Sequence, residues 1–132
     1  MVSLSFSSCN KDKDRKVSNS ERLIGEWIYR TTQEKTNGEW KDMPTQAGAE
    51  GTQTFYKDGK ALITMTFKGK HMEQKFEWNL KDNNDYIING TVRGQILFES
   101  NDCFYHYSDE TLDPGAGENI KGEFRDIYDR KK

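Results

Sequence analysis

Residues 60–80 read KALITMTFKGKHMEQKFEWNL, and this stretch decides the fold class. Apolar and polar side chains alternate on both sides of Gly69, which is the pattern of two half-buried β-strands joined by a tight turn. A two-residue turn at Gly69 and Lys70 would pair Phe67 with Met72. The apolar residues of both strands would then share one face, so the segment predicts a β-hairpin with one side toward a core.

The preceding turn predicts the same face. Lys57-Asp58-Gly59 fits a three-residue hairpin loop in which the glycine takes the left-handed conformation. This register places Phe55 opposite Ala61, whereas a two-residue loop would pair Phe55 with Leu62 and turn the strand over. With the three-residue loop, the shared inner face comprises Ala61, Ile63, Met65, Phe67, Met72, Gln74, Phe76, Trp78 and Leu80.

Segments of period two, with turn signals between them, recur along the rest of the chain. Asn-Gly at 89–90 and Asn-Asp at 101–102 are typical hairpin turns. The eight predicted strands span residues 24–34, 51–56, 60–68, 71–80, 85–88, 91–100, 103–108 and 120–130. In the seventh strand we expect Cys103, Tyr105 and Tyr107 to face inward.

Short links between consecutive strands predict an all-β, up-and-down antiparallel meander. Closing an eight-stranded meander into a barrel removes its exposed edges. Two long connections are expected, at 35–50 and 109–119, and alternation of strand ends places both at one rim. That rim would be an open mouth and the opposite end a floor. Ser18 and Glu21 have capping-box spacing and predict a short helical turn before the first strand.

The charge balance excludes one class of function. The chain carries 20 basic and 22 acidic side chains, for a net charge of −2. Nucleic-acid-binding domains usually carry a basic excess on one face, so we expect no nucleic-acid partner. Seven Phe, six Tyr and three Trp residues supply the core of a chain otherwise poor in apolar side chains.

The sequence offers no catalytic or metal-binding constellation. Cys103 is a candidate nucleophile, but no histidine is placed to activate its thiol, and the alternative is a small buried residue. His71 and His106 are isolated, and both are expected to face outward, which argues against a haem or other metal site. We therefore expect no enzyme activity, no metal and no cofactor.

Residues 1–20 differ in composition from the rest. A short apolar stretch ends in Ser7 and Ser8 before Cys9, and a charged run follows at 10–16. This resembles the end of a bacterial lipoprotein signal peptide, in which the cysteine is lipidated and becomes the mature N-terminus. The resemblance implies a lipid anchor at Cys9 and a place in the bacterial cell envelope, on the outer membrane, facing the periplasm or the cell surface. A free thiol on a disordered tail is the alternative.

The two ends of the expected barrel carry a further resemblance. Gly25-Glu26-Trp27 opens the first strand, and Arg130 ends the last one. This resembles the lipocalin-like barrels of the calycin superfamily, and in particular small bacterial lipocalin-like lipoproteins. In those proteins a Gly-x-Trp begins the first strand and a late arginine packs against that tryptophan. The resemblance implies structural roles for Gly25, Trp27 and Arg130, with Arg125 as the rival partner of the tryptophan.

The expected domains are therefore a signal-peptide remnant and disordered tether at 1–20 and a lipocalin-like barrel at 21–132. An eight-stranded barrel is either filled by side chains or holds one small ligand. The candidate ligand-binding residues are Tyr29, Gln53, Met65, Phe67, Met72, Gln74, Phe76, Phe98, Tyr105 and Tyr107, whose aromatic and methionine surfaces suit an apolar or amphipathic molecule. The alternative is a filled barrel whose rim, including residues 39–50, binds an envelope protein. Trp40 would be either a lid or an outer residue.

Overall fold

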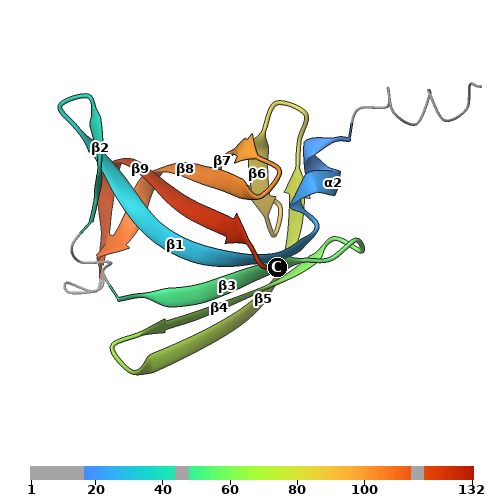
Figure 1. Ribbon diagram of the computed structural model, residues 1–132, viewed down its shortest axis with the longest axis horizontal. Helices are drawn as coiled ribbons and strands as arrows, with labels where there is room; N and C mark the ends of the chain where they lie inside the picture. Colours follow the sequence, from blue (N-terminus) through green and yellow to red (C-terminus); the bar gives the residue numbers. More distant parts are fainter. Residues whose placement is uncertain (1–16, 44–47, 114–117) are drawn as a thin grey trace, which may run out of the picture.

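The computed structural model describes residues 17–43, 48–113 and 118–132 (Figure 1). Cys9 therefore lies outside the described residues. One short helix, α2 (Asn19–Leu23), precedes the strands. The strands are β1 (Gly25–Thr36), β2 (Glu39–Asp42), β3 (Glu50–Phe55), β4 (Lys60–Phe67), β5 (Lys70–Leu80), β6 (Asp85–Ile88), β7 (Thr91–Ser100), β8 (Cys103–Asp113) and β9 (Glu118–Arg130).

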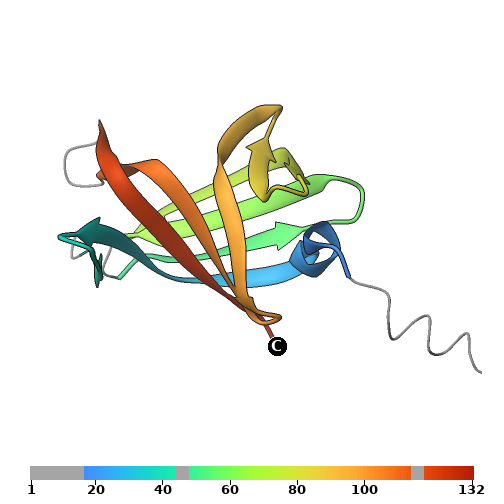
Figure 2. The same cartoon turned by 90° about the horizontal axis from the view of Figure 1, so that it is seen from above.

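The first and last strands close the sheet on itself. β1 pairs antiparallel with β9 from Trp27 opposite Arg130 to Glu34 opposite Phe124. From β3 to β9 each strand pairs with the next one along the chain, and β1 pairs with β3. The predicted closed, eight-stranded, up-and-down antiparallel barrel is confirmed, and Figure 2 shows it turned by 90°. β2 is an additional short strand on the far half of β1.

The hairpins have the turns and registers predicted from the sequence, except for the register of one hairpin. Phe55 lies opposite Ala61 and Gly59 has a φ of +85°, so the three-residue loop is confirmed. The β4–β5 turn, however, is formed by Lys68 and Gly69, both with positive φ, as a two-residue hairpin requires. Met65, and not Phe67, therefore lies opposite Met72. Because the shift is two residues, the predicted inner face is unchanged.

Strands extend into both of the connections that were expected to be long. β1 continues to Thr36 and turns through residues 37–38 into β2. β8 continues to Asp113 and β9 begins at Glu118, which leaves only residues 114–117 as the link. These extensions are rich in polar residues and show no regular alternation, yet their backbones continue the ladder, as in Glu110 opposite Lys121.

The floor is closed by α2, which lies at the end of the barrel where the chain also finishes (Figure 1). The predicted helical turn is confirmed: Ser18 and Glu21 form a capping box. Ser20 donates a hydrogen bond to the carbonyl of Leu80 at 2.8 Å, and Leu23 is fully buried. Within the described ranges, no helix has the length and apolar character needed to cross a bilayer.

The predicted contact between Trp27 and Arg130 is confirmed. The guanidinium carbon lies 4.3 Å from the centre of the indole ring. The guanidinium also donates to the carbonyls of Arg22 and Asn101, at 2.8 and 2.9 Å. The rival partner Arg125 is wrong, because it stacks on Trp40 instead. Arg130 thus ties together the helix, the β7–β8 turn and the first strand.

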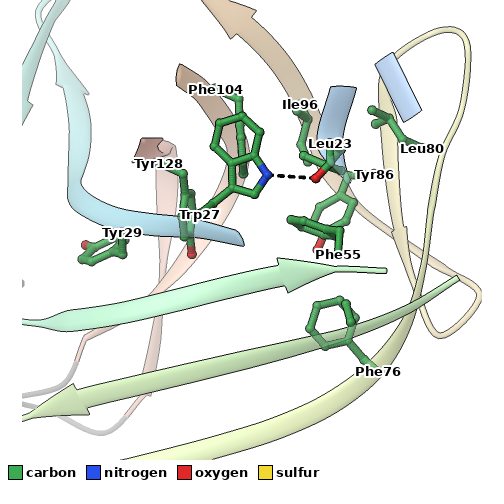
Figure 3. Packing of buried hydrophobic residues seen from close by; sticks show 11 residues of the cluster. Leu23, Trp27, Tyr29, Phe55, Phe76, Leu80, Tyr86, Ile96, Phe104 and Tyr128 are labelled. Atoms are coloured by element: carbon green, nitrogen blue, oxygen red, sulfur yellow. Dashed lines mark hydrogen bonds between the residues drawn. The ribbon is translucent and has the colours of Figure 1, made fainter. Parts of the chain in front are cut away.

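The floor half of the barrel is filled with aromatic side chains (Figure 3). The indole of Trp27 donates to the carbonyl of Leu23 at 2.8 Å and packs edge-on against Phe104, with ring centres 4.7 Å apart. Phe104 in turn stacks on Tyr128 at 5.0 Å. Phe55 and Ile96 are also buried, at 1% and 0% exposure. The described side chains in this half of the interior therefore pack against one another as a core.

Candidate ligand-binding site

A cavity of about 180 Å³ adjoins the aromatic core inside the barrel. It is comparable to an apolar cavity of roughly 150 Å³ that holds benzene in another protein. The cavity is lined by Gln53, Ile63, Gln74, Phe76, Tyr86, Ile88, His106, Asp126 and Tyr128. These residues come from six strands, so only the closed barrel assembles the site.

A carboxylate stands at one side of the cavity. Oδ1 of Asp126 accepts a hydrogen bond from the Thr32 hydroxyl at 2.6 Å. Because that proton points at the carboxylate, the Tyr29 hydroxyl donates to Thr32 in turn. Burial raises the pKa of Asp126 above its ordinary value. Although the carboxylate lies deep in the barrel, 31% of its side-chain surface is accessible, and this surface faces the cavity.

His106 faces the same carboxylate and is largely buried. The expectation that it points outward is wrong. Its Nε2 lies 2.6 Å from the carbonyl oxygen of Arg93, and its Nδ1 lies 3.9 Å from Oδ2 of Asp126. Its ring packs edge-on against Tyr86, with ring centres 5.0 Å apart. In the part of the chain that the structure describes, no three His, Cys, Asp or Glu side chains gather where they could hold a metal ion.

Two tyrosines and a glutamine, Tyr86, Tyr128 and Gln53, also line the cavity. The Tyr86 hydroxyl donates to Oε1 of Gln53 at 2.7 Å. Burial raises the pKa of Tyr86 well above its ordinary value, and it raises the pKa of Tyr128 as well. Burial likewise raises the pKa of Tyr29 to about 12. All three phenols are therefore neutral at physiological pH and act as hydrogen-bond donors and acceptors.

The site opens toward the mouth. Gln74 lines the cavity and is exposed, and Met72, on the same face of β5, is 52% exposed. β6 pairs with β5 only through residues 78–80. Among the described strands, none pairs with this edge of β5 along residues 70–76. The inner face of β5 is therefore reached by solvent, which gives a small molecule a way in.

The closed strand order and the contact between Trp27 and Arg130 together identify the architecture. The fold is a lipocalin-like barrel. Among solved structures it is similar to bovine odorant-binding protein bound to a selenium-containing odorant, with a TM-score of 0.49, 16% identity, and coverage of 90% of this chain and 76% of that chain. The complex of bovine odorant-binding protein with undecanal gives a TM-score of 0.47, 16% identity, and coverage of 90% and 77%. No protein-family model matches the sequence, and no curated protein matches it.

The barrel brings most of the predicted ligand residues to its inner face. Gln53, Gln74 and Phe76 line the cavity. The Tyr29 hydroxyl contacts the Thr32 hydroxyl and so reaches the site through Thr32. Met65, Phe67 and Met72 lie nearer the mouth on the predicted inner face. Phe98 belongs to the floor, where it packs against Trp27 with ring centres 6.1 Å apart.

The inward placement of Cys103, Tyr105 and Tyr107 is wrong. A register shift between Phe98 and Ser100 turns β8 by one residue, so Phe104 and His106 face inward. Sequence reasoning also missed Tyr86, Asp126 and Tyr128. Residues 103–107 read Cys-Phe-Tyr-His-Tyr, which offers aromatic residues to both faces, and period two cannot choose between them.

The displaced tyrosines form a cluster on the outer face with Trp40, which is therefore an outer residue and not a lid. The Arg125 guanidinium lies between Trp40 and Tyr105, at 4.3 and 4.5 Å from the two ring centres. It also donates to Gln33 at 2.8 Å and to the Tyr107 hydroxyl at 3.3 Å. We call Gln33, Trp40, Tyr105, Tyr107 and Arg125 the outer aromatic cluster.

Cys103 is also outside the cavity. Its sulfur lies 3.6 Å from a guanidinium nitrogen of Arg30, on the outer side of β1. Burial raises the pKa of its thiol to about 11. The thiol is therefore protonated at neutral pH, which makes it a poor nucleophile and favours the interpretation as a small buried residue.

Proposed function

We propose that this protein is a non-catalytic, lipid-anchored protein of the bacterial cell envelope that binds one small apolar or amphipathic molecule inside its barrel. The supporting observation is the cavity of about 180 Å³, with apolar walls, a few convergent polar groups and an accessible side. This composition is typical of small-molecule sites. Ile63, Phe76 and Ile88 would contact the apolar body of the ligand, and Gln53 and Asp126 its polar end.

Native mass spectrometry tests the binding proposal. The full chain, purified gently, should carry an adduct that organic solvent removes, and the mass of the adduct would indicate its chemical class. Ile63→Trp should fill the cavity and abolish the adduct. Leu62→Trp is the matched control, because Leu62 is the neighbouring residue on the outer face of β4 and should leave the adduct in place. An unmodified mass in every sample, with no uptake from a lipid mixture, would contradict the proposal.

The anchor is proposed from the sequence, through Ser7 and Ser8 before Cys9 and the charged run after it. The segment from Cys9 to the helix cap at Ser18 could extend at most about 30 Å, long enough to hold the barrel clear of a bilayer surface. Fatty-acid labelling of the source cells should mark the protein and place it in the membrane fraction. Cys9→Ser should lose the label and release the barrel, whereas label on the Cys9→Ser variant would refute the anchor.

A second candidate function is binding of an envelope protein. The outer aromatic cluster favours it, because Trp, Tyr and Arg dominate the binding energy of protein interfaces. Leu97, on the adjoining strand, adds a side chain that is 41% exposed. Cross-linking in envelope extract should yield one defined partner, lost in Trp40→Ala or on deletion of residues 39–50 and kept in Tyr56→Ala, an exposed aromatic at the opposite end of the barrel. Unimpaired cross-linking of the deletion would exclude this role.

A further inference from the structure

Among the described residues, one oxygen of the carboxylate at the cavity wall receives no hydrogen bond. Thr32 donates to Oδ1 of Asp126. Within residues 17–43, 48–113 and 118–132, no side chain lies within hydrogen-bond distance of Oδ2, and the nearest nitrogen is Nδ1 of His106 at 3.9 Å. Because the accessible surface of Asp126 faces the cavity, Oδ2 can accept a hydrogen bond from a molecule bound there.

In its neutral form, the imidazole facing this oxygen also presents an acceptor. The carbonyl oxygen of Arg93 can only accept, so the proton of the neutral His106 ring is on Nε2, which donates to it at 2.6 Å. Nδ1 then carries a lone pair, and it points toward Asp126. Two acceptors, Oδ2 and Nδ1, thus face each other across 3.9 Å at the wall of the cavity. A group with two or more N–H donors would satisfy both.

The surroundings favour a positively charged donor. The rings of Tyr86 and Tyr128 line the same cavity, and aromatic faces attract cations. A cation beside Asp126 would offset the cost of burying its charge, which is the same cost that raises the pKa of this carboxyl. The walls formed by Ile63, Phe76 and Ile88 suit an apolar body. A ligand carboxylate would face Asp126 and be repelled.

We propose that the barrel selects a small primary amine with an apolar body, whose ammonium group donates hydrogen bonds to both Oδ2 of Asp126 and Nδ1 of His106. This inference rests on the proposed function, because it names the ligand class of the same cavity. The volume of about 180 Å³ sets the size of the body near that of a benzene ring with a short side chain.

A series of three compounds that share a phenylethyl body and differ in the terminal group tests the inference on the full, unmodified chain by NMR titration. The probes are 2-phenylethylamine, ethylbenzene and 3-phenylpropanoate. The amine should bind about 10- to 100-fold more tightly than ethylbenzene, which is the range expected for hydrogen bonds to a charged group. The carboxylate should bind more weakly than ethylbenzene.

Two matched variants then test whether Asp126 is the side chain that recognises the amine. Asp126→Asn should lower the affinity for 2-phenylethylamine to about that of ethylbenzene. Asp129→Asn is the control, because Asp129 is on the same strand but pairs with Arg30 outside the barrel, and it should change neither affinity. Since the compound series needs no variant, loss of folding in Asp126→Asn would not affect the test.

The outcomes separate the two proposals. Ethylbenzene binding with equal or weaker binding of the amine would overturn the amine preference and leave the binding function standing. Unchanged amine affinity in a folded Asp126→Asn variant would also overturn the preference. Failure of all three compounds to bind would overturn both proposals. Selective amine binding that depends on Asp126 would support both.

Discussion

The two halves of this barrel interior are built differently. Around Trp27 and Phe104 the floor is fully buried and aromatic, and Arg130 closes it from outside. Toward the mouth, the inner face carries Asp126 and His106 beside a cavity, and its apolar side chains reach solvent at Met72. Burial and ring packing at the floor stabilise the fold. The polar groups of the mouth half, in contrast, are kept at a cost in the free energy of unfolding. This contrast suggests that the floor serves stability, whereas the mouth half suits the proposed binding of a ligand.

The largest expected effect is at the floor. Trp27→Ala should lower the free energy of unfolding by about 3–5 kcal/mol, because it removes the largest fully buried side chain and leaves a cavity. Phe67→Ala, on the half-buried inner face near the mouth, should cost clearly less. Urea denaturation monitored by circular dichroism measures both. Equal losses would show that the two halves are packed alike.

The next effect separates the two stacked arginines. Arg130→Ala should cost about 2 kcal/mol, since it removes a cation–π contact and hydrogen bonds to carbonyls that close the floor. Arg125→Ala removes a similar stacking contact from the outer aromatic cluster, which no buried carbonyl depends on, and should cost less. Differential scanning calorimetry compares the variants. A greater loss for Arg125→Ala would reverse the assigned roles.

A third prediction concerns the pH dependence of stability that the buried carboxyl of Asp126 causes in the mouth half. Because burial raises the folded-state pKa of Asp126 above its unfolded value, ionisation of this group destabilises the fold at neutral pH. Asp126→Asn should therefore raise Tm by a few degrees at pH 7. As pH falls through the raised pKa toward the unfolded value, the wild type regains this stability and the difference should shrink. A lower Tm for Asp126→Asn at pH 7 would instead indicate a structural role.

The smallest effect is on chemical reactivity at the outer side of the floor. With a thiol pKa of about 11, only roughly one thousandth of Cys103 is thiolate at pH 8. Alkylation by iodoacetamide in the Cys9→Ser variant should be far slower in the folded chain than in urea. Mass spectrometry follows the rate. Comparable rates in the two conditions would mean that this end of the barrel opens readily.

Much of the fold could be predicted because its signals are local. The alternation in residues 60–80, the loop at 57–59 and the capping box of Ser18 with Glu21 each act over a few residues, and each is confirmed. The predicted β4–β5 register is wrong by two residues because lysine is not a typical turn residue. In the structure Lys68 nevertheless forms part of the turn, with a φ of +51°. The lipid anchor at Cys9 stays a prediction.

The candidate site could be predicted only in part, because its decisive residues are polar. A polar residue in an alternating strand is normally assigned to the solvent face, so Asp126 and His106 were not expected inside. Gln53 and Gln74 were found because they fall between apolar residues on a clear inner face. The alternation of β8 and β9 could not show which of their two mixed faces is buried.

The amino-acid sequence by itself determined the strands, most of their turns and the closing pair of Trp27 with Arg130, because side-chain alternation and turn residues act through the nearby backbone. Tertiary structure decided which side chains surround the cavity. Register irregularities between Tyr29 and Thr31 and between Phe98 and Ser100 change the face that each strand presents. They bring Thr32 to Asp126 and turn His106 inward, and such shifts arise from pairing between strands that are distant along the chain.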